Sequence, residues 1–222
     1  MRPASDAPQR RHADSRPSGA PRLRRAPLFS AAALRRRVRA LAAELAAERD
    51  PRPLALIGIL RGSFIFLADL VRELHRCGLD PRIDFMTLSS YGAGTRSSGR
   101  VRLVKDFTMD VRGARVVVVD DILDTGRTLR FARRHVRARG AARVKLCALL
   151  DKPSRRVFPC VADWVGFRIP DAFVVGYGLD YDGRYRSLPH ITTVIAPPDA
   201  EGQAESGRQI SSGRNPSRSA KT

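Results

Sequence analysis

The chain has 222 residues and a mass of 24.5 kDa, enough for one domain with its own hydrophobic core, so a miniprotein held together by disulfides is excluded. Hydrophobic residues make up 43% and charged residues 28%, which is typical of a globular chain and excludes disorder over its whole length. The net charge of +19 attracts polyanions, but only four of the 41 basic residues are Lys, which indicates a coding preference, and nucleic acid is not expected as a partner.

The first 27 residues are rich in Arg, Pro and Ser, contain little acid and lack the apolar core of a secretory signal. They are predicted to form a disordered basic leader, and their composition also resembles that of an organellar transit peptide. Apolar residues then recur at helical spacing: Leu34, Val38, Leu41 and Leu45. Because Ser30 can cap this helix, an amphipathic helix opens the folded domain, which we place at residues 28–198.

Strand and helix patterns alternate after this first helix. The nearly continuous apolar run 54–60 predicts a buried strand, and 64–74 predicts a helix. Residues 83–88 and 101–107 predict strands on either side of a polar, glycine-rich segment, 89–100. Segments of that length without periodicity are often lids, so a lid is expected between these two strands.

Val116–Val119 predicts the clearest strand of the chain, because four consecutive valines leave no polar face and suit a parallel strand covered on both sides. A helix at 128–139 and a strand at 144–150 follow, and shorter apolar runs lie at 173–176 and 192–195. The alternation of strands and helices predicts an α/β fold with a central parallel sheet flanked by helices.

The remaining composition carries few further signals. Residues 199–222 have no apolar pattern and are predicted to be a disordered tail. Cys77, Cys147 and Cys160 form no C-x-x-C pair and are odd in number, which argues against a disulfide framework and favours a cytoplasmic location. No apolar stretch approaches the roughly 18 residues of a membrane span, so no membrane partner is expected.

The loop after the valine strand carries the strongest functional signal, because ligands of open parallel sheets bind beyond the carboxyl ends of the strands. Asp120 and Asp121 leave the strand together, and such carboxylates are costly to bury without sugar hydroxyls or magnesium as partners. Asp124 to Thr128 then place small and hydroxyl side chains at a helix amino terminus, where free amides bind phosphate. The pattern predicts a ribose 5-phosphate site.

Two plainer interpretations stay open on spacing alone. Asp124 could serve only as the cap of the following helix, and the paired aspartates could be solvated at the end of the strand.

The segment Val117–Thr128, VVVDDILDTGRT, closely resembles the phosphoribosyl pyrophosphate (PRPP) signature of type I phosphoribosyltransferases. Residues 59–70, ILRGSFIFLADL, resemble the first motif of the hypoxanthine-guanine phosphoribosyltransferases, and Ser89–Gly92 resembles their mobile-loop motif. The part from Asp163 to Arg186 is similar to the purine and magnesium region of that family. The resemblance extends over residues 28–196.

This resemblance implies the type I phosphoribosyltransferase fold, with a small hood subdomain over the purine. It implies a purine-salvage enzyme that converts PRPP and a 6-oxopurine base, hypoxanthine or guanine, to IMP or GMP and pyrophosphate, with Mg²⁺ as cofactor. A homo-oligomer, either a dimer or a tetramer, is the habit of the family. The choice among hypoxanthine, guanine and xanthine does not follow, because the base edge is read largely by backbone groups.

The resemblance also assigns the sugar and phosphate residues. Asp120 and Asp121 would accept hydrogen bonds from the ribose hydroxyls, directly or through magnesium, although many members carry Glu where Asp120 stands. Asp124 would lie near N7 of the purine and assist proton transfer, as the catalytic residue. The 5-phosphate would be bound by the amides of five consecutive residues: Asp124, Thr125, Gly126, Arg127 and Thr128.

Four further roles follow from the same resemblance. Pyrophosphate would be bound by Leu60, Arg61, Gly62 and Arg186, with a cis peptide bond between Leu60 and Arg61. Lys152 would donate to the purine O6, Phe173 would stack on the ring, and backbone groups of Val174 would read the base edge. Asp180 would hold magnesium together with Asp120 and Asp121, and the lid would carry Ser90 and Tyr91.

Two rival functions remain at this point. One is an RNA-binding regulator of the same fold, which the basic charge suits; Asp124 argues against it, because that position need not keep a carboxylate in such regulators. The other is a transferase of this fold that uses xanthine or a pyrimidine.

Overall fold

The computed structural model describes residues 21–90 and 101–195, and the compact unit within them is Leu23–Val194. The second unit, Met1–Arg22 with Ile195–Thr222, falls almost entirely outside the described residues. Most of the predicted leader and all of the predicted tail therefore lie outside them. The first strand, β1 (Arg22–Leu23), belongs to the segment predicted as leader, so regular structure begins before residue 28.

A six-stranded sheet forms the centre of the unit, with the strand order β4-β3-β2-β5-β6-β7. Neighbouring strands are parallel from β3 to β7, and only β4 is antiparallel to its neighbour. The bounds are β2 (Leu54–Leu60), β3 (Arg82–Ser90), β4 (Val101–Lys105), β5 (Arg115–Leu123), β6 (Arg143–Asp151) and β7 (Trp164–Arg168). The predicted α/β fold with a central, mostly parallel sheet is confirmed.

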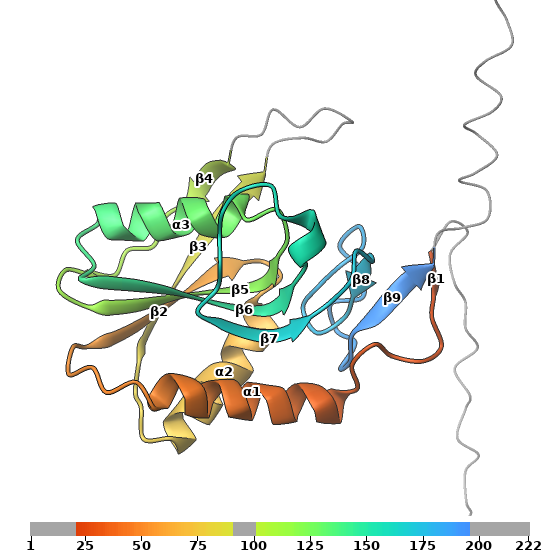
Figure 1. Ribbon diagram of the computed structural model, residues 1–222, viewed down its shortest axis with the longest axis horizontal. Coiled ribbons are helices and arrows are strands. Elements are labelled where there is room, and N and C mark those ends of the chain that lie inside the picture. The colour runs from red at the N-terminus through yellow and green to blue at the C-terminus, as the bar shows by residue number, and fades with distance from the viewer. Residues whose placement is uncertain (1–20, 91–100, 196–222) are drawn as a thin grey trace, which may run out of the picture. The chain divides into compact units, whose positions relative to one another are not determined.

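Helices cover both faces of this sheet (Figure 1). α1 (Ala31–Ala46) and α2 (Phe64–Arg76) lie on one face, and α3 (Arg127–Ala138) lies on the other. Ser30 caps α1 as predicted, since its hydroxyl accepts a hydrogen bond from the Ala33 amide at 3.3 Å. A single 3-10 turn, η1 (Pro153–Arg155), follows β6.

The valines of β5 show why the strand needs no polar face. Val117 and Val119 point into the cluster formed with α1 and α2, while Val116 and Val118 point into the cluster formed with α3. Successive side chains of a strand alternate between the two faces of a sheet, so a strand covered on both sides is apolar throughout. β5 therefore lies in the middle of the unit, and the loop that follows it starts from a rigid position.

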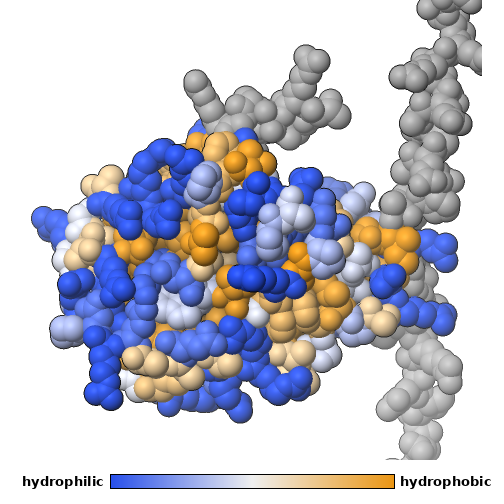
Figure 2. Space-filling view, in the orientation of Figure 1, coloured by the Kyte–Doolittle hydropathy of each residue, from blue (hydrophilic) through white to orange (hydrophobic). Residues whose placement is uncertain are grey.

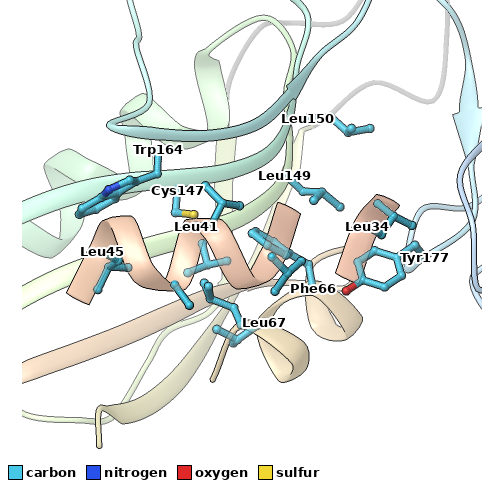
Figure 3. Close-up of a cluster of buried hydrophobic side chains, with 14 of the residues drawn as sticks. Leu34, Leu41, Leu45, Phe66, Leu67, Cys147, Leu149, Leu150, Trp164 and Tyr177 are labelled. Carbon is cyan, nitrogen blue, oxygen red and sulfur yellow. The ribbon is translucent and has the colours of Figure 1, made fainter. Parts of the chain in front are cut away.

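Large apolar side chains fill the face under α1 and α2 (Figure 3). Leu41 and Leu45 of α1 belong to the same cluster as Phe66 and Leu67 of α2, with Cys147 of β6 on the sheet side. α3 packs differently: only three of its side chains are buried, and hydrophilic residues cover its region of the surface (Figure 2). Each helix thus buries one apolar stripe against the sheet.

A second, three-stranded sheet has the order β1-β9-β8, with β8 (Val174–Val175) and β9 (Thr192–Ile195). Segments from both ends of the described chain form it: the Arg24 amide donates to the Thr193 carbonyl at 3.0 Å, and Phe29 pairs with Ile191. The predicted hood therefore also contains amino-terminal residues. Among the described residues, no helix combines the length and apolar character needed to cross a bilayer.

Phe66→Ala should lower the free energy of unfolding by about 3–5 kcal/mol, because the ring is fully buried and its removal leaves a cavity. Phe64→Ala, on the same helix, is the matched control. Its ring is 44% exposed, so the loss should be below about 1 kcal/mol. Urea unfolding of both variants checks this, and equal losses would contradict the described packing of α2.

Candidate active site

A cavity of about 400 Å³ lies beyond the carboxyl ends of β2 and β5. The two strands are neighbours in the sheet, so the loops that follow them meet at the same edge. The lining comes from two stretches of chain, 59–62 and 120–129. The predicted ribose, phosphate and first pyrophosphate-binding segments are therefore brought together in one place.

Two adjacent carboxylates stand at the start of this cavity. Asp120 and Asp121 lie within β5 rather than in the loop predicted after Val119, because the strand continues to Leu123. Asp120 is buried, and its Oδ1 accepts a hydrogen bond from the Asp121 amide at 3.1 Å. Burial raises the pKa of Asp120 well above its usual value, and the neighbouring Asp121 charge raises it further. Burial also raises the pKa of Asp121, against the opposing influence of Asp120 hydrogen bonding and the Arg186 charge. The raised pKa values mean that it is costly to ionise both carboxylates at once, which favours a cationic or hydroxyl-rich partner.

The loop after β2 approaches Asp121 so closely that a side chain is excluded. A Cβ added at Gly62 would lie 1.5 Å from Asp121 Oδ2. Gly178, at φ +101°, lies against the other side of this loop, because a Cβ there would lie 2.1 Å from the Gly62 carbonyl oxygen. The peptide bond between Leu60 and Arg61 is cis, as the resemblance implies. The loop after β2 is therefore packed between the Asp121 carboxylate and Gly178.

The loop from Asp124 to Thr128 leads into α3. Gly126, at φ +83°, is the N-cap residue of α3, and the Arg127 amide donates to the Thr125 hydroxyl oxygen at 3.5 Å. The interpretation of Asp124 as the helix cap is therefore wrong. The Asp124 carboxylate instead lies 3.4 Å from Arg155 Nε, while Arg127 lines the cavity with an Nε that is buried and has no hydrogen-bond partner among the described residues. The Arg127 guanidinium lies over the Phe158 ring, 4.9 Å from its centroid. The amides at the amino terminus of α3 favour an anion here.

Residues after Lys152 hydrogen-bond to the backbone of this loop, and the sequence analysis did not identify them. The Thr125 carbonyl accepts hydrogen bonds from the amides of Val157 and Phe158, at 3.1 and 3.0 Å. Arg156 donates to the carbonyl oxygens of Leu123 and Asp124 and pairs with the Asp151 carboxylate. No motif marks these contacts in the sequence; two adjacent arginines after a proline are the only local signal.

The predicted purine residues lie outside the lining of this cavity. Lys152 is buried beside it: its amide donates to the Leu123 carbonyl at 3.0 Å, and its Nζ lies 3.9 Å from Asp171 Oδ1. Phe173 is 54% exposed and meets Tyr181 edge to face, with ring centroids 5.6 Å apart. Val174 belongs to β8 and is buried. An exposed aromatic ring leaves a face free for a ligand.

Asp180 and Arg186 pair with each other rather than with the aspartates of β5. Arg186 lies 2.6 Å from Asp180 Oδ1 and also donates to the Gly178 carbonyl at 2.6 Å, and Asp180 Oδ2 accepts from the Gly183 amide at 2.7 Å. Within the described parts of the chain, no three acidic, His or Cys side chains gather in a metal-ligating group. The structure joins Asp120 to Asp121 but does not add Asp180 to them.

Of the predicted lid residues, Ser90 ends β3 and Tyr91 lies outside the described residues.

Known proteins resemble this chain in sequence and in fold. Residues 28–182 match the family model described as "Phosphoribosyl transferase domain". The chain belongs to the phosphoribosyltransferase family.

Among curated relatives, the hypoxanthine phosphoribosyltransferase of Haemophilus influenzae is 47% identical over 67% of this chain and 81% of that protein. The hypoxanthine-guanine phosphoribosyltransferase of Bacillus subtilis is 46% identical over 74% and 89%. A crystal structure of a hypoxanthine phosphoribosyltransferase from Staphylococcus aureus superposes with a TM-score of 0.72 at 38% identity, over 77% of this chain and 91% of that one. The phosphoribosyltransferase is therefore an enzyme with the type I fold of that family.

Asp121→Asn should stabilise the free phosphoribosyltransferase at pH 7.5, because burial raises the pKa of Asp121 from 3.8 to about 6. The folded state then binds the proton more tightly than the unfolded state, so this carboxyl lowers stability as pH rises through that interval. The gain in Tm should shrink as pH falls from 7.5 to 4.5.

Asp110→Asn is the control for this series. Its exposed carboxylate is hydrogen-bonded to Arg112, which lowers the pKa of Asp110, so removing the charge should give no gain at pH 7.5. A lower Tm for Asp121→Asn at pH 7.5 would contradict the cost assigned to burying the Asp121 carboxylate.

Proposed function

We propose that this phosphoribosyltransferase transfers the phosphoribosyl group of PRPP to hypoxanthine or guanine, forming IMP or GMP and pyrophosphate in purine salvage. The observation that carries the proposal is the single cavity that joins a buried carboxylate pair, Asp120 and Asp121, to the amides of Asp124–Thr128. The carboxylates suit the ribose hydroxyls, and the helix terminus suits the 5-phosphate. The choice of base rests on the names of the relatives.

In this reaction N9 of the purine attacks the anomeric carbon while pyrophosphate leaves, and positive charge develops on the ribose. The carboxylates beside the sugar stabilise that charge, as they do in glycoside hydrolysis. Arg61, exposed at the cavity, and the amide of Gly62 are proposed to bind the leaving pyrophosphate with Arg186. Asp124 is proposed to take the proton at purine N7, and Ser90 and Tyr91 to close over the site and exclude water.

The carboxylate pair also suits Mg²⁺. Magnesium takes oxygen ligands and is commonly bound by one or two carboxylates together with substrate phosphates. Asp120 and Asp121 offer such oxygens, and a cation would offset the burial that raises both pKa values and the Asp121 charge that raises the pKa of Asp120 further. When bound with PRPP, the metal supplies positive charge that offsets the leaving group. Asp180 is proposed as a further ligand, which requires it to leave Arg186.

Assembly and location are proposed from exposed apolar side chains and from the cysteines. Large apolar side chains are exposed on α2, β3 and β4: Phe64, Ile83, Phe85 and Val104. β3 and β4 are neighbours at one edge of the sheet, and exposed apolar groups of this kind favour self-association, so a homo-oligomer is proposed. The three cysteines are free thiols, which suits a cytoplasmic enzyme.

With PRPP and Mg²⁺ and a panel of free bases, pyrophosphate release should occur with 6-oxopurines and not with adenine. An ammonium only donates, so buried Lys152 satisfies the O6 carbonyl but opposes a 6-amino group. Sites built on such a hydrogen bond discriminate by roughly 10⁴. Lys152→Ala should lose activity on hypoxanthine and guanine and narrow the gap to adenine. Equal kcat/KM for adenine and hypoxanthine in the unaltered enzyme would show that Lys152 does not bind the purine.

Asp124→Asn should lower kcat by roughly 10²–10⁴, the usual contribution of a positioned acid or base. PRPP binding, measured by calorimetry, should largely survive because it relies on backbone amides. Near-normal turnover of the variant would refute the catalytic role of Asp124.

A further inference from the structure

Arg155 and Arg156 both contact Asp124, but Arg156 binds its backbone and Arg155 binds its side chain. Arg156 is mostly buried and donates to the Leu123 and Asp124 carbonyl oxygens, so it fixes the path of the loop. Arg155 is half exposed, and its Nε lies 3.4 Å from Asp124 Oδ1. The carboxylate of Asp124 is therefore placed by a different residue from the one that holds its backbone.

Arg155 also reaches toward the base side of the site. Its Nη1 lies 3.7 Å from Asp171 Oδ2, and the other oxygen of Asp171 lies 3.9 Å from Lys152 Nζ. Arg155 thus stands between the carboxylate proposed to handle the N7 proton and the carboxylate partner of the ammonium proposed to bind O6. The contacts with Asp124 and Asp171 are made by one guanidinium group, and its planar shape fixes the direction of both.

Stability alone does not explain this arrangement. Ion pairs between half-exposed groups contribute at most about 1 kcal/mol to folding. Placement of a reacting group, in contrast, has a large effect on rate, because a displacement of about 1 Å can cost 10²-fold. The exposure of Arg155 therefore points to a role in geometry rather than in holding the fold together.

We propose that Arg155 is a positioning residue that holds the Asp124 carboxylate toward the purine and ties it, through Asp171, to Lys152. The proposal rests on the proposed function, because it assumes that Asp124 acts on the base. It concerns a residue outside the signature segments, and it makes Arg155 act through Asp124 rather than on substrate.

A double-mutant cycle tests this dependence, with Arg155→Gln, Asp124→Asn and the double variant assayed on PRPP and hypoxanthine with enzyme in excess, so that slow variants still give a rate. Arg155→Gln should lower kcat/KM roughly tenfold, within the range of coupling between contacting residues. In the Asp124→Asn background the same change should cost less than about twofold, since the carboxylate it positions is gone.

Two readouts separate positioning from a structural role. The Kd for PRPP and the Tm of Arg155→Gln should match those of the unaltered enzyme, with the loss in kcat and in the KM for the base. Arg155→Lys should recover only part of the rate, because an ammonium keeps the charge but lacks the fork that reaches two carboxylates.

Arg143→Gln is the matched control. Arg143 has the same 50% side-chain exposure as Arg155 and one carboxylate partner, Asp50, at 3.8 Å, but it lies at the opposite end of β6. Its kcat/KM should equal that of the unaltered enzyme.

An unchanged rate for Arg155→Gln, or an equal loss in both backgrounds, would overturn the positioning role while leaving the proposed function intact. Failure of the unaltered enzyme to release pyrophosphate with hypoxanthine or guanine would instead refute the proposed function itself.

Discussion

The site depends on one electrostatic constraint: two adjacent carboxylates lie near the carboxyl end of β5, whose valines are buried on both faces of the sheet. Asp120 and Asp121 cannot both be ionised there without a cost in free energy, and their raised pKa values express that cost. The surrounding chain is arranged around them. Position 62 requires glycine because Asp121 Oδ2 lies where a Cβ would stand. Position 178 requires glycine because the Gly62 carbonyl oxygen lies where its Cβ would stand. Ionising this carboxylate pair is unfavourable in the free protein, so the pair suits a ligand that carries positive charge and hydroxyl groups.

Much of the fold could be predicted because its signals are local. The valines of β5 and the caps and apolar spacing of α1 follow from neighbouring residues, and the structure places both where the sequence indicates. β7 was missed for a tertiary reason. Gly166 weakens the strand pattern, and it is needed because a Cβ there would lie 2.3 Å from the Leu149 carbonyl oxygen of β6. β1 has only two residues, and it exists through its pairing with a segment near the other end of the chain.

The site divides in the same way. The loops after β2 and β5 carry compact motifs, so their meeting at one edge of the sheet could be predicted. The residues that hold those loops could not, because each acts across a long separation in sequence. Arg156 binds carbonyl oxygens about 30 residues earlier, and the Tyr177 hydroxyl donates to Asp69 at 2.6 Å. Such contacts depend on where the folded sheet places its loops, and nothing in the local pattern distinguishes these side chains from ordinary surface or core residues.

The hood segment contacts the loop proposed to bind pyrophosphate and is continuous with the residues proposed to bind the base. Tyr177 is bound to Asp69 of α2, Gly178 lies on the Gly62 carbonyl, and Arg186 donates to the Gly178 carbonyl. The same short segment begins directly after Phe173 and Val174, which are proposed to bind the base. The segment that follows the proposed base-binding residues therefore also contacts the loop proposed to hold pyrophosphate, at Gly62.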